Sequence, residues 1–222
     1  MSLLASSVAL AQSTTNSIFI EQVGDGSNIS ITQKGQSNKV GTEQNRVVLE
    51  GNNQTITATQ EGNNNSIQGS IVQADNVEMD VTVTGDNNTL TYDQGDAASV
   101  AGSTKTLAVT GDSNTLAFNQ GTAASATGAT QTITITGDTN TLTSTINADD
   151  VVNTKTIAGD SNTITTVQNG TAGKNIEMLL TGNTNTVEIK QSSTTNVDTL
   201  KINSTSNGST ITINQCNAGG PC

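Results

Sequence analysis

Aliphatic and polar residues alternate one by one in short segments along most of this chain. Asn88, Leu90, Tyr92 and Gln94 fall on one side of such a segment, and Asp93 falls on the other side with two threonines. This period of two is that of a β-strand with one buried face. A second alternating segment ends two residues before each of several glycines. The pattern therefore predicts an all-β chain built from pairs of short strands.

The strand pairs recur as an internal repeat. The segment TGDNNTLTYDQG begins at Thr84, and related segments begin at Thr110, Thr136, Ala158 and Thr181. Their glycines lie 22 to 26 residues apart, which predicts a β-solenoid whose coils each contain two strands and two turns. Glycine accepts a positive φ and the Asp or Asn that follows can bond its own backbone, so one turn is predicted there in every coil. The predicted turn glycines are Gly35, Gly62, Gly85, Gly111, Gly137, Gly159 and Gly182.

A single coil is not expected to fold. It buries about four aliphatic side chains at roughly 1.5 to 3 kcal/mol each, while ordering about twenty residues costs on the order of 1 to 2 kcal/mol per residue. Stacked coils add backbone hydrogen bonds and let each buried amide bond the amide of the next coil. The ladder predicted in these repeats consists of Asn88, Gln94, Asn114, Gln120, Asn140, Asn162, Gln168, Asn185 and Gln191.

One coil departs from the repeat. Ile146 stands where the ladder has glutamine, and counting back from Gly159 places Lys155 on the inward face. Because an unpaired buried charge is unfavourable, we expect a bulge or a register shift between residues 145 and 158.

Composition narrows the function. The chain is 32% hydrophobic and 1% aromatic, with a net charge of -11, so neither an ordinary globular core nor nucleic-acid binding is expected. No apolar stretch approaches the roughly 20 residues of a membrane-spanning helix. With no His and one Tyr, the usual catalytic groups are missing, and we expect neither an enzyme nor a cofactor. The adjacent Asp149 and Asp150 would point to opposite faces of a strand.

The two ends of the chain suggest export. Residues 1–15 are interpreted as a signal-peptide-like leader or an N-terminal arm, since Ala9-Leu10-Ala11 matches a signal-peptidase site. Cys216 and Cys222 are the only cysteines, and a disulfide between them in a C-terminal cap, residues 216–222, fits an oxidising compartment. Two free or intermolecular thiols are the alternative. The solenoid is expected to span residues 16–215.

Toward the N-terminus the repeat becomes more specific. Ser27, Gln33, Gly35, Asn38 and Gln44 reproduce the pattern S-x5-Q-x-G-x2-N-x-A-x3-Q except that Val40 replaces its alanine, and the next unit has Gln60, Gly62, Asn65 and Ile67. From about residue 16 to residue 68 the chain resembles curlin, the subunit of curli fibres. Beyond residue 77 the resemblance thins.

The resemblance implies a secreted bacterial protein whose stacked coils polymerise end to end into amyloid-like fibres of a biofilm matrix. Its partner would then be a second copy of itself. It also implies that Ser27, Gln33, Asn38, Gln44, Gln60 and Asn65 are inward ladder residues. Similar repeats occur in phage structural proteins, so a virion fibre or decoration protein, with virion proteins as partners, is the alternative function. An adhesin or adhesive fibre displayed at the cell surface is a third possibility.

Two further patterns admit other readings. The recurring GD-x-N offers oxygen ligands for calcium, although such residues are ordinary turn formers. Pairs of outward threonines resemble the surface of ice-binding β-solenoids and would form two files, interrupted at Ala117 and Glu188. These pairs are Thr55/Thr57, Thr89/Thr91, Thr141/Thr143, Thr163/Thr165 and Thr210/Thr212.

Overall fold

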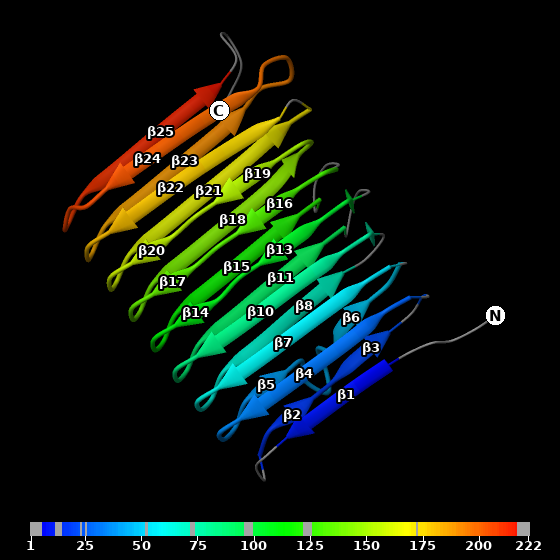
Figure 1. Cartoon of the computed structure of the whole chain (residues 1–222). Coiled ribbons are helices and arrows are strands. Elements are labelled where there is room, and N and C mark those ends of the chain that lie inside the picture. The colour runs from blue at the N-terminus through cyan, green and yellow to red at the C-terminus, as the bar shows by residue number, and fades with distance from the viewer. Residues whose placement is uncertain are drawn as a thin grey trace.

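The chain forms a parallel β-solenoid. A computed structural model describes residues 6–11, 15–22, 24, 26–51, 53–71, 74–95, 100–121, 126–171 and 173–216. In these residues the structure is all-β, with no helix, and its strands stack into about eight turns, as the sequence predicts. Figure 1 shows a rod in which the chain advances steadily from one end to the other. No helix long and apolar enough to cross a membrane occurs in the described part.

Two sheets face each other along the rod, and every pairing between strands is parallel. Sheet A contains β1 (Ser6–Ala11), β4 (Asn28–Lys34), β7 (Thr55–Glu61), β10 (Glu78–Thr84), β13 (Thr104–Thr106), β14 (Val109–Thr110), β16 (Thr130–Thr132), β17 (Ile135–Thr136), β19 (Val152–Thr154), β20 (Ile157–Ala158), β22 (Lys174–Thr181) and β24 (Asp198–Ser204). Sheet B contains β2 (Ser17–Ile18), β3 (Ile20–Gln22), β5 (Lys39–Val40), β6 (Val47–Leu49), β8 (Ser66–Ile71), β11 (Thr89–Gln94), β15 (Thr115–Gln120), β18 (Thr141–Ala148), β21 (Thr163–Gly170), β23 (Thr186–Ser192) and β25 (Thr210–Cys216). The short β9 (Ala74–Asp75) and β12 (Val100–Ala101) pair at a corner between the sheets.

The core lies between the two sheets and is filled by alternate residues of each strand. In β10, for example, Met79, Val81 and Val83 are buried while the residues between them are exposed. In β11 of the facing sheet, Leu90 and Tyr92 are buried. The period of two in the sequence therefore becomes one buried core that runs the length of the rod.

Strand pairing does not slip where the sequence predicts a bulge or shift. Strand β18 pairs residue for residue with both neighbours, so that Ile146 lies opposite Gln120 on one side and Gln168 on the other. Lys155 stays inward and is fully buried. The expectation of a shift between residues 145 and 158 is wrong, because the Lys155 amine finds a hydrogen-bond partner inside the core, Ser144 Oγ at 2.8 Å.

The described fold also begins earlier than expected. Residues 6–11, assigned above to a leader or arm, form β1 and pair with β4 in the same parallel register as the later coils. Part of the predicted leader is thus the first strand of sheet A.

The turn between the sheets is nearly identical in the seven coils that contain a predicted turn glycine. The seven predicted turn glycines have φ between 99° and 117°, and the residue two positions after each has φ between 56° and 59°. A Cβ added to any of these glycines would lie 2.0 to 2.3 Å from the carbonyl oxygen of the matching turn residue in the next coil. Glycine is therefore required by contact between coils as well as by φ.

We expect Gly111→Ala to lower the free energy of unfolding by about 2 to 4 kcal/mol, because its Cβ would meet the Gly137 carbonyl oxygen at 2.3 Å. Gly102→Ala is the matched control: Gly102 also has a positive φ, 65°, but its Cβ would meet nothing closer than 3.8 Å. Urea unfolding followed by circular dichroism measures both. An equal loss of stability in the two variants would show that the positive φ, and not the contact with the next coil, accounts for the effect.

Candidate functional site

The most regular polar feature of the molecule is a ladder of buried asparagines on the inner side of the turn. Each backbone N–H donates to the Oδ1 atom of the asparagine in the preceding coil, as Asn114 does to Asn88 and Asn140 does to Asn114, both at 2.9 Å. In the ladder asparagines from Asn38 to Asn162 the Nδ2 atom also donates to the turn glycine carbonyl of the following coil, as that of Asn140 does to Gly159 at 2.8 Å. The ladder members are Asn38, Asn65, Asn88, Asn114, Asn140, Asn162 and Asn185, all buried.

The predicted glutamines form two short ladders and two contacts across the core. Gln33 donates to Gln60 at 2.8 Å. At the other end Gln168 donates to Gln191 at 2.9 Å, and Gln191 donates in turn to Gln215, a residue that the sequence analysis missed. Gln94 and Gln120 are in register but bond across the core, to Lys105 and Ser103 respectively.

Two predicted ladder residues do not take part. Ser27 is buried, but its hydroxyl has no hydrogen-bond partner among the described residues. Gln44 is exposed in the loop that joins β5 to β6, so its assignment as an inward ladder residue is wrong. Leu49 takes the inward place instead, opposite Gln22 and Ile71. The loop stands out from sheet B because this coil is longer, with Ile31 pairing with Ala58 27 residues later.

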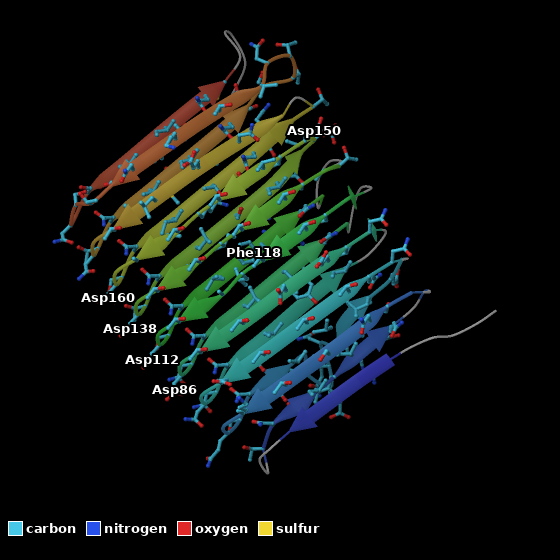
Figure 2. All side chains as sticks on the ribbon, viewed as in Figure 1. Asp86, Asp112, Phe118, Asp138, Asp150 and Asp160 are labelled. Atoms are coloured by element: carbon cyan, nitrogen blue, oxygen red, sulfur yellow. The ribbon has the colours of Figure 1, made fainter. Side chains whose placement is uncertain are left out.

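A second column runs along the outer side of the same turn. Asp86, Asp112, Asp138 and Asp160 form a line along one edge of the rod (Figure 2). The Oδ1 atom of each accepts the backbone N–H of the matching residue one coil earlier, as Asp138 does from Asp112 at 2.7 Å. Within the described residues no group of three or more His, Cys, Asp or Glu is placed to hold a metal ion. The geometry of these aspartates is that of turn-forming residues.

Three lysines lie inside the solenoid. Lys105 contacts the Gln94 side chain and faces the Tyr92 ring at 5.9 Å, and Lys155 donates to Ser144. Burial lowers the pKa of Lys105 to about 7, with a smaller opposing effect from Asp93, and burial lowers the pKa of Lys155 to about 7. Lys174 differs because Asp198 lies 3.4 Å away, and its Nζ atom also donates to the Ser193 carbonyl at 3.0 Å. Only Lys155 was identified from the sequence, although Lys105 follows the same alternation two residues before Leu107.

The predicted threonine array divides between the two faces. Thr55 and Thr57 lie on β7 of sheet A, whereas the other pairs lie on sheet B, so the array as predicted is not one surface. On sheet B a file of six threonines is in register. Ice binding stays a prediction, tested by thermal hysteresis of the purified chain. The file is Thr89, Thr115, Thr141, Thr163, Thr186 and Thr210.

The predicted disulfide between Cys216 and Cys222 can be checked only at Cys216. Cys216, the last residue of β25, is disulfide-bonded. Cys222, its predicted partner, lies outside the described residues.

Comparison with known proteins adds no family assignment: no family model, no curated protein and no solved structure matches this chain. The proposed function is therefore based on the geometry of the asparagine ladder, the aspartate column and the glutamine contacts in the core.

We expect Asn140→Ala to destabilise the solenoid by about 2 to 4 kcal/mol, because it removes the partners of Gly159 and Asn162 in the next coil and leaves buried polar groups unpaired. Asn119→Ala, on the outward face of β15, is the control and should change stability by less than about 0.5 kcal/mol. Denaturant midpoints of the two variants test this. Similar midpoints would mean that the ladder contributes no more than surface amides.

The buried lysines predict an unusual pH dependence. Between pH 7 and about 10 the unfolded chain holds protons on Lys105 and Lys155 that the folded chain has lost, so stability should rise with pH in this window and be lower below pH 7. Lys155→Met should raise stability at pH 7 by roughly 2 to 4 kcal/mol and flatten the rise, whereas Lys39→Met, at an exposed position, should do neither. Unfolding measured from pH 6 to 9.5 decides the matter. A slope unchanged in Lys155→Met would show that this amine is charged in the fold.

Proposed function

We propose that this chain is a structural subunit of an extracellular fibre of the curlin-like type, and that it joins other solenoid chains by strand addition at a terminal coil. The asparagine ladder is the observation that carries the proposal. It is a repeated set of directed hydrogen bonds along the rod axis, and nothing in its geometry depends on whether two adjacent coils belong to one chain or to two.

The end coils support this mode of association. In the described pairings β1 pairs only with β4 at one end, and β25 pairs only with β23 at the other, so each keeps one edge without a neighbouring strand. Apolar side chains that are buried in the middle of the rod are only partly buried there, as for Ile18 and Ile20 at the first coil and Ile213 at the last. Unpaired strand edges beside apolar surface favour addition of a further coil.

The flanks of the rod fit an extracellular structural role. Acidic side chains recur along one edge and the net charge is -11, which keeps separate rods apart laterally while leaving the ends as the apolar contact surfaces. The disulfide at Cys216 agrees with an oxidising compartment.

A virion fibre could be built from the same stacked repeats. The experiment must therefore show where the protein is found, on extracellular fibres or on phage particles. Antibodies raised against the purified chain, detected with gold by electron microscopy, should label extracellular fibres of the organism that encodes it. Label on phage particles would establish the virion alternative. Label confined to the cytoplasm, with fibres and particles both bare, would end the structural-fibre proposal.

A further inference from the structure

The two ends of the rod carry the same inward side chains in sheet B. Counted from the ladder position, which is Asn16 in the first coil and Ser209 in the last, isoleucine follows at the second and fourth residues and glutamine at the sixth. All six side chains are only partly buried, whereas the same three positions are fully buried one coil before the last. Each end thus presents two aliphatic groups and one amide to a coil that would lie beside it. They are Ile18, Ile20 and Gln22 in the first coil, and Ile211, Ile213 and Gln215 in the last.

The glutamine ladder of the last coils ends on a hydrogen-bond donor. In Gln191 the Nε2 atom donates to the Asn175 carbonyl oxygen at 3.3 Å and to Oε1 of Gln215 in the next coil at 2.8 Å. In Gln215 the Nε2 atom donates to the matching Thr199 carbonyl oxygen at 3.4 Å, and among the described residues it has no acceptor in a further coil. By the direction of the ladder, the second N–H of this amide faces the open end of the rod.

The first coil carries the matching acceptor. Gln22 stands at the same position of the coil as Gln215, but the residue opposite it in the second coil is Leu49, which has no amide. Within the described part of its own chain Gln22 therefore belongs to no glutamine ladder. In a first coil stacked on the last coil of another copy, the Oε1 atom of Gln22 would stand to Gln215 as the Oε1 atom of Gln215 stands to Gln191.

The backbone at the two ends allows both sheets to continue together. Strand β1 ends at Ala11 and β24 ends at Ser204, and each of these residues lies five positions before the ladder position of its coil. A partner that continues sheet B in register therefore continues sheet A in register as well. The only charged residue in the end strands of sheet B, Glu21, would lie opposite Asn214, so no like charges meet there.

Such a joint would differ from an interior contact at the turn. Serine takes the turn-glycine position in both end coils, as Ser13 and Ser206, and the first coil is nevertheless followed by a second one in register. The asparagine ladder, in contrast, is interrupted. Ser209 donates its N–H to Asn185 Oδ1 at 2.9 Å, but it has no amide oxygen to offer to the backbone N–H of Asn16 in an added coil. A joint between two copies is therefore weaker than the contact between two coils of one chain.

We propose that the first coil of one copy stacks on the last coil of a second copy in the register that sets Ser17 opposite Thr210, with Gln215 donating to Gln22 across the joint. This rests on the proposed function and adds the identity of the partner, the polarity of the fibre and the residues that fix the register. The aliphatic side chains of both ends become buried in the joint, and the interrupted asparagine ladder makes the joint the place where a fibre breaks.

Cysteine cross-linking of the full chain tests the register. Chains with Ser17→Cys and chains with Thr210→Cys, mixed and oxidised in air, should form a disulfide-linked dimer, because opposite residues of neighbouring parallel strands have Cα atoms about 5 Å apart. Ser17→Cys mixed with Thr212→Cys is the control, since a shift of two residues separates the Cα atoms by about 8 Å, beyond disulfide reach. Non-reducing electrophoresis measures both. Dimer in both mixtures, or in neither, would overturn the proposed joint.

Substitutions at the joint test the hydrogen bonds. Gln22→Leu removes the acceptor but keeps a side chain that fits beside Leu49, and the critical concentration for fibre growth should rise by roughly three- to tenfold. Ser209→Asn gives the Asn16 N–H an acceptor and should lower it by a similar factor. Gln44→Leu, in an exposed loop, is the matched control and should leave it unchanged. Sedimentation of fibres measures the critical concentration, and circular dichroism checks that each variant is folded.

The result for the joint is separate from the result for the proposed function. Critical concentrations that do not respond to Gln22→Leu or Ser209→Asn would overturn the joint, and so would a chain that stays a single rod at every concentration. Gold label on native fibres together with a failed cross-link would leave the fibre role standing and show that the partner is a different chain. A specific cross-link without label on fibres would instead show that the two ends fit each other but that the protein is not fibre material in the organism.

Discussion

The whole structure depends on one requirement, which is that a buried amide must find its hydrogen-bond partners in the coils before and after it. An asparagine inside a single coil would leave its N–H, its Oδ1 and its Nδ2 groups without water and without partners. In the stack the same three groups bond along the axis, as around Asn140. Because the hydrogen bonds of each buried amide are completed only by the neighbouring coils, one repeat alone forms neither the fold nor the ladder.

This requirement explains why the turn is so uniform while the remainder of each coil varies. The asparagine stays in line only if successive turns superpose, which fixes the glycine, the residue with positive φ and the Asp or Asn between them. The described residues of the opposite corner carry no such column, and between one coil and the next the offset changes from 26 to 22 residues without breaking the register of the sheets. The loop that contains Gln44 shows the same tolerance on the face of sheet B, since the chain leaves the sheet after Val40 and returns at Val47.

The interior tolerates polar residues where a partner lies across the core. Gln120 meets Ser103, Asn153 meets Gln168, and Lys155 meets Ser144, so sheets A and B are joined by hydrogen bonds as well as by aliphatic contact. Burial lowers the pKa of Lys105 and of Lys155, whereas Lys174 has the Asp198 carboxylate beside it. A core with few aromatic side chains thus gains specificity of register from its amides and hydroxyls.

The amino-acid sequence by itself determined the fold class, the turn glycines and the asparagine ladder, because each is a strictly periodic feature that needs only the neighbouring repeat for its meaning. The sequence did not predict the position of a residue where that position depends on partners far away in the chain. Gln44 matched the repeat pattern, yet a longer coil moved it onto a surface loop, and Lys155 was expected to disturb the register until the core supplied Ser144. The threonine pairs looked alike in sequence, but Thr55 and Thr89 lie on opposite sheets. That the turn glycines are required by contact between coils became visible only in the structure, where a Cβ on Gly111 would meet the Gly137 carbonyl oxygen of the next coil at 2.3 Å.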